Sequence, residues 1–150
     1  MSFVGGAAIL LGGSLYSSRV VEQLWSSNPP ESLRQWGPVM QLAGARFFRI
    51  ATPSVGLLAL LTLLTSFGTP WPHRRWRLAA STLFLGVVVW SVVYFVPTAL
   101  MLSGPELDDI PPAQAIAETA QWVRLDDFRM LLVLAALACG ARALYVPARG

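Results

Sequence analysis

Three side chains that can carry charge or stack on an aromatic molecule share one face near the C-terminus of the chain. Trp122, Asp126 and Arg129 are spaced i, i+4 and i+7, which places them on the same side of an α-helix. They lie near the start of an apolar segment, ending at about Tyr145, that is long enough to cross a membrane. Ionisable groups are costly at membrane depth, and they usually face the interior of a bundle and pair there. The spacing therefore predicts a buried ionic site.

Other apolar segments place polar side chains at the same depth. Counted at about 1.5 Å per residue from the opposite end of each segment, Arg19, Arg49, Tyr94 and Asp126 all lie about 24–27 Å along. Arginine forms forked contacts with carboxylates, so we expect Asp126 to pair with Arg49 or Arg19 from a neighbouring helix. The faces that carry these residues are rich in small residues toward their other end, which lets helices pack closely. We therefore expect the helices to pack tightly in one half of the bundle and to surround a polar, aromatic-lined pocket in the other half.

A purely structural role is the alternative for this polar layer. Arginines and acids near span ends often reach the interface and fasten helices together. Tyrosine and tryptophan at this depth are also typical of an aromatic belt at the membrane surface. The pattern alone leaves both interpretations open.

Composition and hydropathy define the elements that must position this layer. Of the 150 residues, 55% are hydrophobic and only 13% are charged, against about a quarter charged in soluble domains. Apolar stretches of about 20 residues, sufficient to cross a membrane, are predicted at 2–24, 47–67, 78–102 and 118–145. We expect an all-α fold, an integral membrane four-helix bundle that forms one domain over 1–150. The long connection between the first two spans predicts a short interfacial helix.

Charge is sorted by side of the membrane. Arg74, Arg75 and Arg77 lie in the short connection between the second and third spans, and Arg142 ends the fourth. All eight acidic residues fall on the other side. Because arginine in short loops marks the cytoplasmic side, we expect both the N- and C-termini in the cytoplasm. The chain contains no lysine, which indicates a GC-rich bacterial genome and hence an inner-membrane protein.

Several kinds of site are excluded by counts. The single cysteine, Cys139, rules out an internal disulfide, and the single histidine, His73, rules out a multi-histidine metal or haem site. His73 reads as an interfacial residue and Cys139 as a small packing residue. No phosphate loop or dinucleotide motif occurs, and the basic run is too short to predict nucleic-acid binding. We expect no metal and no cofactor; the expected partners are membrane lipid, a lipophilic small molecule and further copies of the chain.

The order of several short motifs resembles a known family. They are GGSLYSSRVV ending the first span, NPPESL in the first connection, RRW before the third span, YFVP ending it and WVRLDDFR opening the fourth. This arrangement is similar to a family of small four-helix membrane proteins of unknown function that includes the anthrone-oxygenase-like proteins. The resemblance covers most of the chain, and its best piece is Trp122, Asp126 and Arg129.

The resemblance implies a chemistry for the polar layer. The characterised branch of that family oxidises anthrones to anthraquinones with dioxygen and without a cofactor. Carried over, it makes Asp126 the base that removes an acidic C–H proton, with Arg129 and Arg49 stabilising the resulting anion. The expected substrate contacts are Tyr16, Arg19, Trp90, Tyr94 and Trp122. The alternative is a non-enzymatic membrane subunit that binds lipid or a protein partner.

Overall fold

The computed structural model describes residues 2–145, except for the side chains of residues 40–43 and 45. This part of the chain is helical and contains no strand, which confirms the all-α prediction. In chain order the elements are α1 (Ser2–Tyr16), a π-helical turn η1 (Ser17–Val21), α2 (Glu22–Trp25), α3 (Glu31–Ser66), α4 (His73–Trp90), a second π-helical turn η2 (Ser91–Phe95), α5 (Val96–Ser103), a 3-10 turn η3 (Pro105–Asp109) and α6 (Pro112–Tyr145).

Four helical segments are long and apolar enough to cross a membrane, as the hydropathy pattern predicts. They are Ser2–Trp25, Arg46–Ser66, His73–Ser103 and Pro112–Tyr145. Large apolar side chains cover their outer surface; Ile9, Ile50 and Val93 are 67%, 71% and 71% exposed. Exposure of so many apolar groups is costly in water and favourable in lipid.

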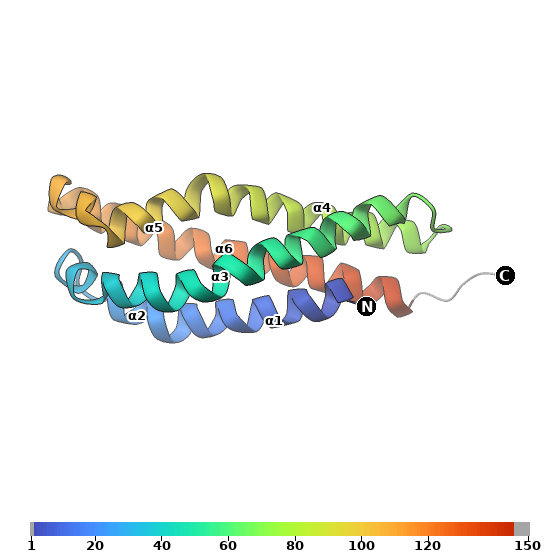
Figure 1. The fold of residues 1–150 in the computed structure, drawn as a ribbon, viewed down its shortest axis with the longest axis horizontal. Coiled ribbons are helices and arrows are strands. Elements are labelled where there is room, and N and C mark those ends of the chain that lie inside the picture. Colours follow the sequence, from blue (N-terminus) through green and yellow to red (C-terminus); the bar gives the residue numbers. More distant parts are fainter. Residues whose placement is uncertain (1, 146–150) are drawn as a thin grey trace.

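The bundle has two different ends (Figure 1). Helix α1 begins, α6 ends and the α3–α4 connection lies at one of them, which we call the terminal end. The α2–α3 and α5–α6 connections lie at the other, which we call the distal end. Four spans return the chain to the end where it started.

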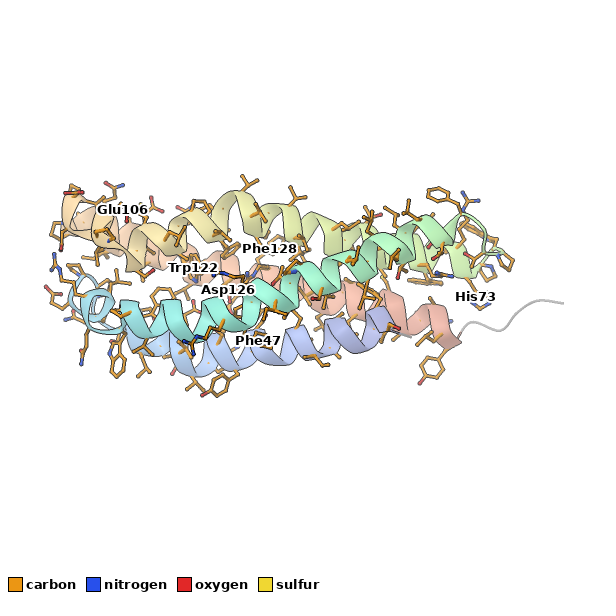
Figure 2. All side chains as sticks on the ribbon, viewed as in Figure 1. Phe47, His73, Glu106, Trp122, Asp126 and Phe128 are labelled. Carbon is orange, nitrogen blue, oxygen red and sulfur yellow. The ribbon has the colours of Figure 1, made fainter. Side chains whose placement is uncertain are left out.

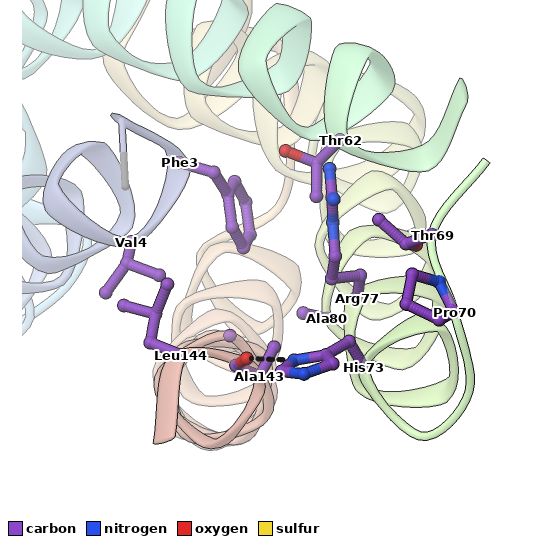
Figure 3. A pocket seen from close by; sticks show the side chains of 11 residues that line it. Phe3, Val4, Thr62, Thr69, Pro70, His73, Arg77, Ala80, Ala143 and Leu144 are labelled. Carbon is purple, nitrogen blue, oxygen red and sulfur yellow. Dashed lines mark hydrogen bonds between the residues drawn. The ribbon is translucent and has the colours of Figure 1, made fainter. Parts of the chain in front are cut away.

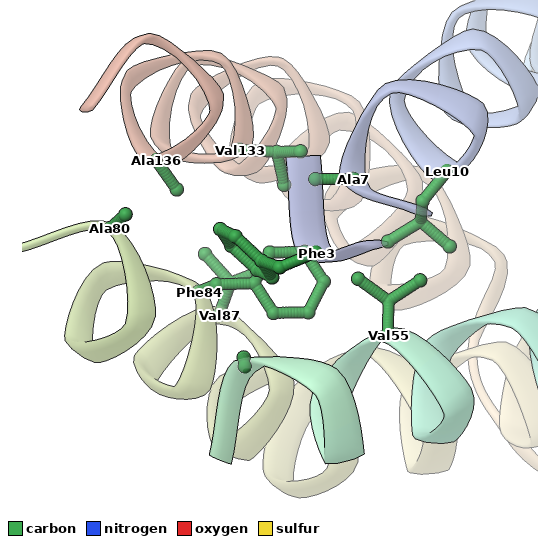
Figure 4. Packing of buried hydrophobic residues seen from close by; sticks show 10 residues of the cluster. Phe3, Ala7, Leu10, Val55, Ala80, Phe84, Val87, Val133 and Ala136 are labelled. Atoms are coloured by element: carbon green, nitrogen blue, oxygen red, sulfur yellow. The ribbon is translucent and has the colours of Figure 1, made fainter. Parts of the chain in front are cut away.

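The four long helices pack in the ring order α1, α3, α4, α6, because each of them makes its main contacts with the next. Their inward faces form an apolar core in the terminal half of the bundle (Figure 4). Phe84 is fully buried at its centre, and the Phe3 ring meets it edge to face at 5.5 Å between centroids. Small residues surround this aromatic pair, among them Ala7, Ala80 and Ala136, each 0% exposed. This apolar core is the tightly packed half of the bundle that the sequence predicts.

Each of the first and third spans contains a π-helical turn. A π turn holds one residue more than an α turn, so it rotates the following side chains to a new face. In the third span the cause is readable in the sequence: Pro97 has no N–H, and its ring crowds the carbonyl four residues earlier, at Val93. The wider turn at Ser91–Phe95 relieves that crowding, and the Ser91 hydroxyl donates to the Val87 carbonyl at 2.8 Å.

The predicted interfacial helix between the first two spans is wrong. Helix α3 runs without a break from Glu31 to Ser66, and Leu33 in its first turn is 1% exposed. Its first turns pack on α5 and η3 and form a second apolar core, which we call the distal cap: Trp25, Leu33, Leu102, Leu107 and Ala115. An ion pair between Arg34 Nε and Asp108 Oδ1, 3.0 Å apart, crosses the surface of this cap.

Candidate functional site

The centre of the candidate site is an ion pair on α6. Asp126 is 5% exposed, and the Arg129 guanidinium contacts its carboxylate through Nη2. The two residues are three apart, so they meet on the inner face of one helix. The expected inter-helical pairing of Asp126 with Arg49 or Arg19 is therefore wrong, because the partner comes from the same helix. Figure 2 shows Trp122 and Asp126 between the helices, far from His73 at the terminal end.

A second buried carboxylate faces this pair. Glu22, at the start of α2, is 5% exposed and interacts electrostatically with Asp126 and Arg129. The Glu22 Oε1 atom has no hydrogen-bond partner among the residues that the structure describes. The site thus combines two carboxylates with one guanidinium. A buried acceptor atom without a donor is suited to a ligand that brings a hydroxyl or an acidic hydrogen.

Aromatic rings cover the ion pair from the α4–α5 side. The Arg129 Cζ atom lies 4.4 Å from the centroid of the Phe95 ring, a cation–π contact. Phe95 in turn meets Trp122, Tyr94 and Trp90 edge to face at 4.9, 5.2 and 5.3 Å between centroids. Trp122 also meets Trp25 at 5.9 Å, which joins the site to the distal cap.

Five of the eight predicted site residues are therefore gathered in one place: Trp90, Tyr94, Trp122, Asp126 and Arg129. The other three are not. Tyr16 is 64% exposed, and Arg19 and Arg49 are exposed as well, on the outer surfaces of the first span and of α3. The face predicted for the first span points outward, and the inward face carries Glu22 and Trp25 instead.

Three residues of this site are absent from the predicted set: Phe95, Trp25 and Glu22. Phe95 ends the second π turn and Trp25 follows the first. Plain α-helical spacing from the buried residues Phe84 and Ala7, which lie 11 and 18 residues earlier, already points to the inward face for both. The acid Glu22 in an otherwise apolar span could have been predicted to face inward, because a charge at that depth needs a protein partner.

The larger of the two described cavities does not lie at the polar layer, where the sequence predicts a pocket. The cavity beneath Arg129 has a volume of only about 20 Å³. A cavity of about 440 Å³ lies instead at the terminal end, beside His73 and Arg77 (Figure 3). Where the sequence predicts a polar, aromatic-lined pocket, the buried Asp126 lines neither of these cavities and lies in a layer of polar and aromatic side chains. Within residues 2–145, no group of three or more His, Cys, Asp or Glu side chains is placed to hold a metal ion.

Comparison with known proteins gives one match. The family model described as anthrone oxygenase matches residues 42–139, which span helices from α3 to most of α6 and include Asp126, Arg129 and the aromatic rings of η2. No curated protein and no solved structure matches the chain.

Proposed function

The chain belongs to the anthrone oxygenase family, and from this premise we propose that it is a membrane-embedded oxygenase that needs no cofactor. Its substrate class is a lipophilic aromatic ketone with an acidic C–H group, such as an anthrone. The observation that carries the proposal is the buried Asp126–Arg129 pair beneath the ring of Phe95. It supplies a base and a cation next to aromatic surface.

The proposed reaction gives each group one task. Asp126 accepts a proton from the methylene carbon opposite the ketone, which leaves an anion whose charge is spread onto the ketone oxygen. Arg129 stabilises that oxygen because a fixed cation in an apolar site is already oriented toward the developing charge. The carbanion then reduces dioxygen: one oxygen atom becomes the new carbonyl, and the other leaves as water with the two methylene hydrogens.

Among the predicted cations, the proposal assigns this role to Arg129 and not to Arg49. Arg129 is largely buried and touches Asp126, whereas Arg49 is exposed on α3. Trp90, Tyr94 and Trp122 are proposed to contact the rings of the substrate. The filled layer means that binding must displace some of these side chains, since an aromatic tricycle is far larger than the small cavity beneath Arg129.

Oxygen uptake with a panel of anthrones and hydroquinones tests this function. Asp126→Asn removes the base with little change in shape, and we expect a loss of at least about 100-fold. Asp127→Asn is the matched control, because its side chain is exposed and lies one residue away. Arg129→Gln is expected to lower uptake as well, whereas Arg49→Gln is expected to leave it unchanged. Equal rates for the two aspartate variants would refute the assignment of Asp126.

A non-enzymatic role as a lipid- or partner-binding subunit is the second candidate, and the filled interior around Asp126 favours it. In that case the ion pair only holds helices in place. Absence of uptake with every substrate, by a protein that circular dichroism shows to be folded, is the result that selects this candidate.

A further inference from the structure

The cavity at the terminal end is lined by side chains from all four spans (Figure 3). Helix α1 contributes Phe3, α3 contributes Thr62, α4 contributes His73 and Arg77, and α6 contributes Ala143. Its volume of about 440 Å³ falls within the range of about 300–1,000 Å³ that is usual for small-molecule sites. It lies at the opposite end of the core from the Asp126–Arg129 pair, so the proposed oxygenase chemistry does not use it.

One wall of this cavity is polar and positively charged. The His73 Nδ1 atom lies 3.0 Å from the Ala143 carbonyl oxygen. Because a carbonyl only accepts, Nδ1 carries the proton, and Nε2 is the ring nitrogen that is left for a ligand. The Arg77 Nη2 atom donates to the Thr65 hydroxyl at 2.7 Å, which engages one of the five guanidinium N–H groups.

The charge of Arg77 has no carboxylate partner in the part of the chain that the structure describes. The described ion pairs, Arg34–Asp108 and Arg129–Asp126, lie elsewhere, and the residues that line the cavity include no Asp or Glu. An unpaired guanidinium in a partly enclosed site attracts anions, and its planar fork suits two oxygen atoms at once.

The facing wall is apolar. Phe3, Val4 and Leu144 line it, and the small side chains of Ala80 and Ala143 leave the space open. A ligand that fills the cavity must therefore present an anionic oxygen group to Arg77 and an apolar body to Phe3. Enclosure by four helices suits a compact body better than two acyl chains.

We propose that this cavity is a binding site for an amphiphile with one anionic oxygen head group and a compact apolar body. Two sources carry this chemistry: a free aromatic anion, such as a phenolate or a carboxylate, and the phosphate head of a short lipid segment. The Arg77 guanidinium binds the head, His73 and Thr62 supply further hydrogen-bonding groups, and the Phe3 ring packs on the body.

Calorimetric titration of the detergent-purified chain with anthraquinone-2-sulfonate tests the proposal, because this probe is flat, apolar and permanently anionic. We expect one equivalent to bind per chain. Arg77→Gln should weaken binding by about tenfold or more, the size expected for loss of a charged hydrogen bond. Ala143→Leu should weaken it similarly by filling the cavity, and it leaves every charge in place.

Arg75→Gln is the matched control. It removes an equal charge from the same turn, but Arg75 stacks on Trp71 and Trp76 and does not line the cavity. We expect its affinity, and that of Asp126→Asn, to stay within about twofold of the unsubstituted chain; a change of that size is smaller than one hydrogen bond. An unchanged affinity in Arg77→Gln, or an equal loss in Arg75→Gln, would overturn the proposal.

Competition distinguishes the two sources of the anion. Displacement of the probe by a short single-chain lysophosphatidylglycerol identifies a lipid head group as the natural ligand, and failure to displace it identifies a free aromatic anion; both results support the site. Inorganic phosphate carries the head group without the body, so we expect it to compete poorly. If phosphate displaces the probe at concentrations close to the Kd of the probe, the apolar wall contributes nothing and the proposed site is wrong.

Discussion

The Asp126 carboxylate depends on Arg129 for its burial. A buried ion pair adds little by itself, because desolvation offsets most of the attraction between the charges. Removal of one partner is different, since it leaves the other charge buried and unpaired. At this site, removal of Arg129 would leave two buried acids without their cation, because Glu22 also lies near the same guanidinium. Arg129 therefore balances two carboxylates, although it forms a direct ion pair with only one of them.

This imbalance predicts a strongly non-additive pair of substitutions. Arg129→Gln is expected to lower the free energy of unfolding by about 3–5 kcal/mol, the usual effect of breaking a buried pair. Asp126→Asn combined with Arg129→Gln should recover part of that loss, because no unpaired charge is left at Asp126. Thermal denaturation in detergent, followed by circular dichroism, measures both.

Arg124→Gln serves as the control for that cycle, since Arg124 is an exposed arginine on the same helix. We expect its effect to stay within about 0.5 kcal/mol. Additive losses in the double variant would show that the two side chains act independently and that the pair does not stabilise the bundle.

The π-helical turn Ser17–Val21 sets which side of the first span faces the interior. Before it, Phe3, Ala7 and Leu10 point inward; after it, Glu22 and Trp25 do. Because a π turn is an α-helix with one residue inserted, removal of one residue there restores an α-helix without rotating either flank. Removal of a residue from the regular part of α1 must rotate one flank by about 100° relative to the other.

Two single-residue deletions test this function of the turn. Deletion of Val20, 45% exposed in the π turn, is expected to change the free energy of unfolding by less than about 1 kcal/mol. Deletion of Ile9, 67% exposed in α1, turns core residues outward and should cost several kcal/mol, about the sum of two large-to-small core substitutions. Both proteins are compared by thermal denaturation; equal stability would mean that the π turn does not set the register.

The fourth and first spans show how much of the site could be predicted. On α6, which contains no π turn, the sequence spacing correctly places Asp126, Val133 and Gly140 on the inward face. On the first span the residues are apolar on all sides, so periodicity gives no clear phase, and Tyr16 and Arg19 were placed on the wrong face. Local propensity does not reveal where a span inserts one extra residue. The number and approximate bounds of the spans depend only on hydropathy, and they were predictable.

The molecule as a whole has opposite charge characters at its two ends. Arg74, Arg75 and Arg77 gather at the terminal end, where Arg74 and Arg75 also stack on Phe67, Trp71 and Trp76. The connection η3 at the distal end contains Glu106, Asp108 and Asp109. On this charge distribution we propose that the terminal end faces the cytoplasm and that the membrane is a bacterial inner membrane.

Cysteine labelling tests this orientation. In a Cys139→Ala background, Ser27→Cys places a thiol at the exposed distal end, and Gly68→Cys places one at the exposed terminal end. A membrane-impermeant maleimide added to intact spheroplasts should label Ser27→Cys and should reach Gly68→Cys only after lysis. The reverse pattern would place the arginine-rich end outside.

The length of the helices adds a further consequence. Helix α3 has 36 residues and α6 has 34, about 54 and 51 Å at 1.5 Å per residue. The hydrocarbon layer is only about 30 Å thick, so both helices extend well beyond it, and the distal cap lies over the carboxylates. A thicker or thinner bilayer would shift the membrane boundary along these helices, at a modest cost in hydrophobic mismatch. Asp126 is buried by the protein alone, at 5% exposed, so its separation from water does not depend on the lipid composition in which the chain resides.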